Sequence, residues 1–428
     1  MTPSGRRTLG RVIEMEHNAL QVEVRAWLRE HWNPDIALAE WRELLADSGW
    51  GCPTWPTDYF GRGLSSDDAR LVEHEFVEAG AVGVAGGSAM SLAAPTVLAH
   101  GSHDVKQRLL RGALTGAHKW CQLFSEPGSG SDLAGLTTKA ERDGDEWVVS
   151  GQKVWTTGAQ HAAYAMLLAR TDWDVAKHRG ITWFAFPMDQ PGVEVRPLRQ
   201  MNRYTSFNEV FINEARVPHA NVVGDVNDGW AAALTTLSFE RGLTTLRMAR
   251  VPAGGGRCIR EAREEAESYA KVYEWYPQRA GRADLVLPQA RAAGLTNDVV
   301  LRDAMMSAHA FERTARWNVD RAVAARQSGR SPGPEGSLAK LTGSTIARQS
   351  HALHARIAGA HAMLANSDSP LNGIIHEILV SVPGASIAGG TDEIQHNIVG
   401  ERSLGLPREP STDAHLAFRD VPRNTGRG

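Results

Sequence analysis

Residues 120–136 read WCQLFSEPGSGSDLAGL, and the character of the chain changes at this stretch. A short apolar run leads into three glycines, one proline, three serines and the acidic residues Glu126 and Asp132. Clusters of these residue types mark loops in most proteins, and such a segment is too polar for a buried strand. Taken alone, it is either an ordinary surface turn or a cradle for a ligand with phosphates or a polar ring, because a Gly-rich motif by itself is a weak indication of binding.

The chain before this stretch has helical spacing. Residues 66–81 begin with Ser and Asp, which favour helix N-termini, and place Val72 and Phe76 on one face. Residues 103–118 have the pattern of a short amphipathic helix that ends at a glycine. These patterns predict an N-terminal helical domain at residues 1–118.

The next part of the chain, residues 119–228, has the pattern of β-structure. Short runs rich in Val, Ile, Phe and Trp are separated by Gly, Pro, Asn and Asp, which is typical of an all-β domain. These runs are residues 146–158, 161–171, 180–188, 193–198 and 207–218. They predict a β-barrel-like middle domain.

Helical spacing returns after residue 229. Three long segments with few breakers indicate an up-and-down four-helix bundle: residues 230–251, 297–329 and 337–364. Between them, Pro277 and Pro288 interrupt residues 273–294, for which we expect an exposed loop. Residues 407–428 are polar, and we expect a loosely held tail. The sequence therefore predicts a mainly α-helical protein with a central β domain, and a C-terminal bundle domain at residues 229–428.

Composition narrows the class of function. The chain has 428 residues, 42% of them hydrophobic, and a net charge of −3, so nothing in its bulk charge favours nucleic acid or an acidic membrane surface. No run of about 18 apolar residues and no secretory signal are present, and the three cysteines are far apart. We expect a cytoplasmic protein with no membrane segment and no metal site.

Two segments hold candidate catalytic or binding groups. Gly389 and Gly390 precede Thr391, which can cap a helix whose exposed N–H groups would bind a phosphate or an oxyanion, although a plain helix cap explains the pattern equally well. Glu240 lies on the flank of an apolar helical stripe with threonines at i−4 and i+4, where a partly desolvated carboxylate could act as a general base. The alternative for Glu240 is an exposed helical residue, or one paired with Arg241 or Arg247.

Four motifs together resemble the acyl-CoA dehydrogenase family, in the family's order and over nearly the whole chain. They are QLFSEPGSGSDLAGL at 122–136, VVSGQKVWTTGAQHA at 148–162, GVEVRPL with FNEVFINEARVPHANVVGDVNDGW between 192 and 230, and GGTDEIQHNIVGERSLGLPRE at 389–409. The pattern is especially similar to actinobacterial members that act on lipids, steroids and branched acids.

The resemblance implies bound FAD and α,β-desaturation of an acyl-CoA thioester, in which a base removes the α-proton and the β-hydrogen leaves as hydride to the flavin. It also implies a homodimer or homotetramer that passes electrons to an electron-transfer flavoprotein. The FAD-binding residues that it implies are Gln122, Leu123, Phe124, Ser125, Gly130, Ser131, Trp155, Thr156, Thr157, Thr391 and Glu393, with Arg356 and Gly359 contacting the FAD of a neighbouring subunit. Ser131, Leu237 and Arg241 would lie near the acyl-CoA.

The sequence departs from the family pattern at two places. Many members have a catalytic glutamate where this chain has Gly389, which leaves only a backbone N–H to polarise the thioester carbonyl. A second family solution places the glutamate on the first long helix of the bundle, and Glu240 matches that position. The family's Arg-x-x-Phe-Gly segment is not reproduced between residues 273 and 300, where Arg279, Arg282 or Arg291 would have to substitute.

Three hypotheses follow from this resemblance. The leading one is an FAD-dependent acyl-CoA dehydrogenase. An acyl-CoA oxidase or flavin monooxygenase would use the same fold, and the incomplete 273–300 segment also fits a non-catalytic subunit of a heteromer. The loss of the glutamate at Gly389 would leave room for a branched or bulky acyl group.

Overall fold

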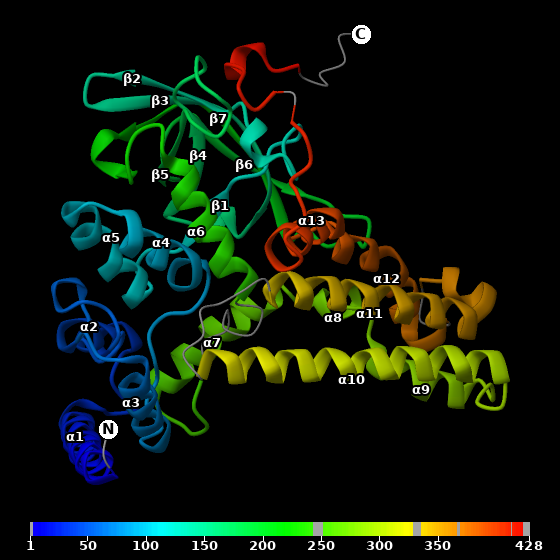
Figure 1. Ribbon diagram of the computed structural model, residues 1–428, viewed down its shortest axis with the longest axis horizontal. Helices are drawn as coiled ribbons and strands as arrows, with labels where there is room; N and C mark the ends of the chain where they lie inside the picture. Colours follow the sequence, from blue (N-terminus) through cyan, green and yellow to red (C-terminus); the bar gives the residue numbers. More distant parts are fainter. Residues whose placement is uncertain (1–2, 243–250, 328–334, 366–368, 412, 423–428) are drawn as a thin grey trace.

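The computed structural model describes residues 3–242, 251–327, 335–365, 369–411 and 413–422. Helices come first, a β-sheet follows, and helices return, as predicted (Figure 1). No helix among these residues combines the length and the apolar character needed to cross a bilayer.

The ends of the N-terminal helices are set by local capping. Ser65 accepts a hydrogen bond from the backbone N–H of Asp68, and Ser102 accepts one from that of Val105, so each hydroxyl fixes a helix start. The helices of this part are α1 (Pro3–His31), α2 (Leu38–Ser48), α3 (Ser66–Glu78), the π-helix η2 (Ala89–Ala93), α4 (Ala94–His100) and α5 (His103–Thr115).

The middle part forms an eight-stranded sheet in the order β6-β7-β3-β2-β4-β5-β8, with β1 beside β4. Paired strands are antiparallel, except that β1 and β2 run parallel to β4. Each of the five predicted β runs contains one strand, β3 to β7. The strands are β1 (Trp120–Leu123), β2 (Lys139–Asp143), β3 (Glu146–Thr157), β4 (Tyr164–Arg170), β5 (Ile181–Pro187), β6 (Val193–Leu198), β7 (Phe207–Pro218) and β8 (Val222–Val223).

Successive residues of β4 point into two different cores. Met166 and Leu168 pack in a cluster with residues of α4, α5 and α6, whereas Ala165 and Leu167 pack in a second cluster with β3 and β7. Helices that precede and follow the β-strands in the sequence therefore cover one face of the sheet. This packing brings α6 (Gly229–Gly242) against β5 (Figure 1).

The C-terminal part is helical, as predicted. α10 packs alongside α11, whereas α7 packs against α2, where Arg42 forms an ion pair with Glu265. The predicted helix over 230–251 is described as far as Gly242, and residues 243–250 lie outside the described residues. The remaining helices are α7 (Arg257–Lys271), α8 (Tyr276–Arg279), α9 (Ala283–Ala292), α10 (Val299–Gln327), α11 (Glu335–Ala358), α12 (Ile374–Ser381) and α13 (Asp392–Ser403).

The prediction of an exposed loop over residues 273–294 is wrong, because this segment contains α8 and α9. Pro277 falls in the first turn of α8, where the missing N–H costs no helical hydrogen bond. Pro288 lies inside α9, which is retained because Val286 and Ala290 are buried against α10 and α11. The prolines are therefore accommodated within helices and do not convert the segment to a loop.

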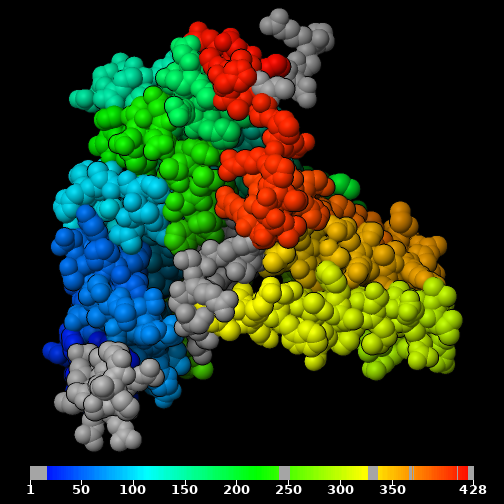
Figure 2. All heavy atoms as spheres, viewed as in Figure 1, coloured from blue at the N-terminus to red at the C-terminus, as the bar shows by residue number. Residues whose placement is uncertain are grey.

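The prediction of a loosely held tail at residues 407–428 is also wrong for residues 413–421. Phe418 is only 1% exposed, and residues 413–421 lie against the sheet domain (Figure 2). A buried aromatic residue thus helps to anchor an otherwise polar segment.

Candidate active site

Two predicted site residues meet between β1 and α6. The side-chain amide of Gln122 donates a hydrogen bond to the carboxylate of Glu240 over 3.4 Å. Both side chains are half-buried, so the carboxylate is partly removed from water but remains accessible. The packing of α6 on the sheet therefore places an acid beside β1. This strand leads into residues 125–132, which we call the Gly/Ser-rich loop.

The position of α6 is fixed by contacts on its buried face. The hydroxyl of Thr236 is fully buried and lies 2.9 Å from that of Thr96 on α4. Leu237, the predicted acyl-CoA contact, is partly buried against the cluster shared with the sheet. Arg241 also belongs to α6, but its side chain is outside the described residues.

The Gly/Ser-rich loop is held by a buried ion pair that the sequence motifs did not indicate. The Nζ of Lys153 lies 2.9 Å from the carboxylate of Glu126, and the two side chains are 0% and 5% exposed. Lys153 also donates to the carbonyl of Phe124 at 3.1 Å. The backbone N–H groups of Thr137 and Thr138 donate to the same carboxylate, at 2.7 and 2.9 Å.

This arrangement keeps Glu126 ionised. Burial alone would raise the pKa of Glu126, but the charge of Lys153 and the hydrogen bonds from Thr138 and Thr137 lower it to about 2. Glu126 lies at the start of the loop, and Thr137 and Thr138 follow it. The contacts of this carboxylate with Lys153 and with the two N–H groups therefore tie β3 to both ends of the loop.

The predicted FAD-binding residues of β1 and the loop differ in exposure. The side chains of Leu123 and Phe124 are buried in the two sheet cores, and the carbonyl of Phe124 accepts the hydrogen bond from Lys153. Ser125 is half-buried, and its carbonyl accepts a hydrogen bond from Val154 N–H. Gly130 and Ser131 lie on the exposed part of the loop.

Trp155 occupies an irregularity between β3 and β7, whose register shifts between Lys153 and Thr156. Its φ of +64° is in the left-handed region, an uncommon conformation for a bulky residue that often marks a functional position. The bulge turns the indole outward, 56% exposed and edge-on to Phe207. Thr157, the last residue of β3, pairs with Phe207.

The hydroxyl of Thr156 is a buried, unsatisfied group in this region. Thr156 is 2% exposed, and its Oγ1 has no hydrogen-bond partner among the described residues. Gly128 and Gly130 have no atom within 4 Å of where a Cβ would be. An exposed indole, an orphaned buried hydroxyl and open space beside two glycines fit a planar, hydrogen-bonding ring system such as a flavin.

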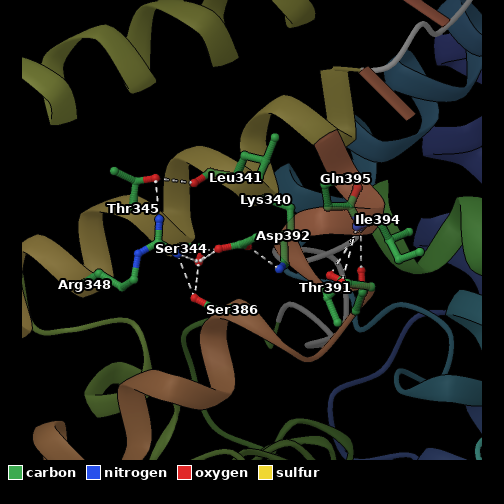
Figure 3. Close-up of polar contacts among 12 residues, drawn as sticks. Lys340, Leu341, Ser344, Thr345, Arg348, Ser386, Thr391, Asp392, Ile394 and Gln395 are labelled. Atoms are coloured by element: carbon green, nitrogen blue, oxygen red, sulfur yellow. Dashed lines mark hydrogen bonds and ion pairs between the residues drawn. The ribbon is translucent and has the colours of Figure 1, made fainter. Parts of the chain in front are cut away.

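The second Gly-rich segment, residues 389–391, is held in place by the contacts of the next residue, Asp392, with α11 (Figure 3). The carboxylate of Asp392 contacts Lys340 Nζ at 2.7 Å, Ser344 Oγ at 2.8 Å and the guanidinium of Arg348. Burial would raise the pKa of Asp392, but these three residues lower it to about 2. α11 therefore holds the start of α13.

Thr391 caps α13 as predicted from its position. Its Oγ1 accepts a hydrogen bond from Ile394 N–H at 3.3 Å. Glu393 is exposed in the first turn, and its own backbone N–H together with the Thr391 hydroxyl lowers its pKa. A carboxylate at this helix end is also favoured by the helix dipole.

The Gly389–Gly390 turn requires glycine. The two residues have φ values of +70° and +84°, and the Gln395 side chain donates to both carbonyls, at 3.0 and 3.4 Å. No atom lies within 4 Å of a Cβ built on Gly389. α11 contacts both α13 and α6, so this turn and Glu240 belong to elements that share one packing partner.

Arg356 and Gly359 lie apart from these groups. Arg356 is exposed near the end of α11, where its guanidinium is 3.8 Å from Asp298. Lys340 and Arg356 are separated along one helix by about 24 Å at 1.5 Å per residue. The chain therefore does not gather these two residues with Thr391 and Glu393, as expected if they serve a neighbouring subunit.

Two of the three arginines considered as substitutes in the 273–300 segment, Arg279 and Arg282, have local partners. The Arg279 guanidinium lies 5.0 Å from the ring of Tyr276, and Arg282 forms an ion pair with Asp284 at 2.6 Å. Neither contact singles out one arginine as an FAD ligand.

A cavity of about 650 Å³ lies between α3, η2 and residues 251–253. Its lining is largely apolar and includes Val77 and Met90, whereas the buried hydroxyl of Ser91 has no hydrogen-bond partner among the described residues. η2 also packs against α6. This π-helix therefore links the cavity to the helix of Glu240, in keeping with the frequent occurrence of π-helical turns at functional sites.

No group of three or more His, Cys, Asp and Glu side chains in the described part of the chain is placed to hold a metal ion.

Sequence signals existed for the missed groups. Lys153 is a lone charge in the apolar run of β3, and a lone buried charge requires a counter-charge. Lys340, Ser344 and Arg348 are spaced four residues apart, which puts three donors on one face of α11.

Three family models match successive parts of this chain. The N-terminal domain of acyl-CoA dehydrogenases matches residues 14–117, the middle domain residues 121–214 and the C-terminal domain residues 287–404. The fold and the site thus define a three-domain acyl-CoA dehydrogenase architecture, and the chain belongs to the acyl-CoA dehydrogenase family.

Individual relatives agree with this assignment. The chain is 33% identical to the acyl-CoA dehydrogenase IpdE1 of Mycobacterium tuberculosis over 91% of its own length and 97% of that protein. It is 36% identical to FadE34 of the same organism over 85% of this chain, which is 46% of FadE34. Among solved structures, the Tcur3481-Tcur3483 steroid ACAD has a TM-score of 0.61 at 25% identity, covering 92% of this chain and 98% of that one. The ChsE4-ChsE5 complex from Mycobacterium tuberculosis has a TM-score of 0.60 at 28% identity, over 92% of this chain and 98% of that one.

Proposed function

We propose that this protein is an FAD-dependent acyl-CoA dehydrogenase that converts an acyl-CoA thioester to a trans-2-enoyl-CoA. The observation that carries the proposal is the position of Glu240, half-buried and hydrogen-bonded to Gln122 at the base of the Gly/Ser-rich loop. Family membership supplies the reaction class, and this carboxylate supplies the base that the reaction requires.

Glu240 is the proposed catalytic base. Its carboxylate would take the proton from the α-carbon of the thioester, and the amide of Gln122 would keep the accepting oxygen in position. The rest of α6 is held by Thr236, so the base sits on a rigid element rather than on a loop.

Gly389 is the proposed source of the backbone N–H that stabilises the enolate-like oxygen. The α-proton of a thioester is weakly acidic, and loss of one such preorganised donor typically costs about 3 kcal/mol of transition-state stabilisation. The hydrogen bonds of Gln395 to the turn and of α11 to Asp392 keep this donor in a fixed orientation.

Bound FAD would supply the acceptor for the hydride that leaves the β-carbon. The residues that would hold it are Gln122–Ser125, Gly130, Ser131, Trp155–Thr157, Thr391 and Glu393, with Arg356 and Gly359 contributed by a neighbouring subunit. The Thr156 hydroxyl would gain the hydrogen-bond partner that it lacks among the described residues. Trp155 would cover one face of the ring and exclude water.

We propose a bulky acyl group for the substrate. The cavity of about 650 Å³ is within the range of sites for drug-sized ligands, and its apolar wall suits a hydrocarbon body. A solved relative is named a steroid ACAD, which supports a large, branched or polycyclic acyl group. Leu237 would border the acyl group, and Ser131 and Arg241 would lie near the CoA arm.

We further propose an electron-transfer flavoprotein as the electron acceptor and a homodimer or homotetramer as the assembly. The similarity to the ChsE4-ChsE5 complex supports a second candidate, in which this chain is one subunit of a heteromer. In that case the isolated chain would bind FAD weakly or not at all, and co-expression with a related chain would restore binding.

Anaerobic titration with acyl-CoAs tests the proposal. Bleaching of the flavin band by straight, branched or steroid side-chain acyl-CoAs is expected, followed by slow reoxidation in air. Fast reoxidation would instead identify an acyl-CoA oxidase or a flavin monooxygenase. Purified protein without flavin absorbance would favour the non-catalytic subunit.

A further inference from the structure

Lys177 joins two segments that are far apart in the sequence. Its Nζ lies 3.1 Å from the carboxylate of Asp132 and 3.4 Å from that of Asp413. Asp132 ends the Gly/Ser-rich loop, and Asp413 belongs to the C-terminal segment. Partial burial lowers the pKa of Lys177, but the two carboxylates more than offset this and raise it. One ammonium group therefore bridges the loop and the tail.

Arg170 makes a second connection between the same two segments. Its guanidinium is fully buried and donates to the carbonyls of Ala134 at 2.6 Å and Leu136 at 3.3 Å, just after the loop. The Cζ of the guanidinium lies over the ring of Phe418, 3.4 Å from its centroid. A desolvated cation–π contact of this kind is among the stronger ones.

The C-terminal segment is attached along its length. The backbone N–H of Phe418 donates to the carbonyl of Val175 at 2.8 Å, and that of Arg419 donates to Trp173 at 3.0 Å. The guanidinium of Arg419 forms an ion pair with Asp174. The segment therefore pairs with residues 173–175, and its Asp413 contacts Lys177.

The middle of the loop is held less firmly than its ends. Glu126 anchors the two ends through Lys153 and the N–H groups of Thr137 and Thr138, whereas Gly130, Ser131 and Asp132 are exposed. Glycines have the highest backbone entropy, so a loop of this composition needs external contacts to keep one conformation. Lys177 and Arg170 supply these contacts at its C-terminal end.

We propose that Lys177 and Arg170 are positioning residues for the Gly/Ser-rich loop, and that residues 413–421 hold both of them in place. The tail is thus part of the support of the cofactor site. This inference rests on the proposed function in one respect, namely that the loop holds FAD.

The test compares FAD release from purified holoenzyme variants, followed as the rise of flavin fluorescence after dilution. Truncation after Pro410 removes the segment, whereas truncation after Pro422 keeps every described contact and is the matched control. We expect release to be about five-fold faster or more in the first, the lower range of typical coupling between sites, and unchanged in the second.

Point variants separate positioning from general destabilisation. Asp413→Asn removes one surface charge and decides the question if the truncated chain does not fold. Faster release from Asp413→Asn and Lys177→Met, with release near wild type from Lys177→Arg, supports the proposal. Wild-type release from Asp413→Asn, Lys177→Met and Phe418→Ala overturns it.

Hydrogen exchange distinguishes a failure of this inference from a failure of the proposed function. If the wild-type protein holds no FAD, a homo-oligomeric FAD-dependent dehydrogenase is wrong, but hydrogen exchange at residues 128–136 still tests whether the tail supports the loop. Faster exchange there in the protein truncated after Pro410, with unchanged exchange in α10, supports the role of the tail. Equal exchange in both truncated proteins contradicts it.

Discussion

The amide of Gln122 and the carboxylate of Glu240 lie 3.4 Å apart, although 118 positions separate them in the sequence. Gln122 is on β1 and Glu240 is on α6, and the two elements meet because both pack into the core on the same face of the sheet. The strand that enters the Gly/Ser-rich loop and the helix with the proposed base are therefore fixed relative to each other by the core.

Replacement of Glu240 by glutamine is expected to lower the rate of flavin reduction by about a hundred- to ten-thousand-fold, the range for loss of a general base. The amide keeps the shape and the contact with Gln122, so bound FAD should remain. Stopped-flow reduction of the holoenzyme by acyl-CoA measures this effect. Ser238→Ala is the matched control, because Ser238 is exposed on the same helix. Reduction at the wild-type rate in Glu240→Gln would exclude this residue as the base.

Replacement of Lys153 by methionine is expected to destabilise the protein by about 3–5 kcal/mol, because it leaves Glu126 buried without a counter-charge. The double variant with Glu126→Gln should recover part of this loss. Lys139→Met is the control, since its ion pair with Glu141 is exposed and worth at most about 1 kcal/mol. Urea denaturation measures the free energy of unfolding, and a single variant as stable as the double would contradict the assignment.

The parts of the fold that the sequence predicts are those with local patterns. The five β runs are confirmed as β3 to β7, because alternation and turn residues act over a few positions. α9 and the docked tail were mispredicted for a shared reason. Val286 and Phe418 are stabilised by partners distant in the sequence, and no local pattern reports such contacts.

The same distinction applies to the candidate site. The motifs led to Gln122, Glu240 and Thr391, whose surroundings fit their proposed roles, although those roles stay predictions. The supports of the site were missed because each joins separate elements, as Asp392 does with Arg348 across 44 positions. Burial and counter-charge become visible only once the chain is folded.

The contribution of Asp392 to stability is expected to vanish in acid. Its pKa is lowered from an ordinary 3.8 to about 2, so the folded state binds this proton less readily than the unfolded state. The stabilisation, about 2 kcal/mol, is complete above pH 3.8 and is lost as the pH falls towards 2. Thermal unfolding of the wild type and of Asp392→Asn should therefore begin to converge below about pH 3.8 and coincide only near pH 2. A constant difference from pH 7 to pH 3 would argue against an ionised Asp392 at the start of α13.

Reducing the cavity beside η2 is expected to change the choice of substrate. Val77 is 40% exposed at the cavity wall, so Val77→Trp can extend into the cavity without overpacking a closed core. We expect kcat/KM for a branched or polycyclic acyl-CoA to fall by about ten-fold or more, with a smaller effect on a short straight chain, because a methylene-scale change in a pocket is worth about 1–3 kcal/mol. Val22→Trp, on the exposed face of α1, is the matched control. An equal loss for all acyl-CoAs would mean that the cavity does not hold the acyl group. A ring added inside a cavity that holds this group should affect bulky acyl groups more than short ones.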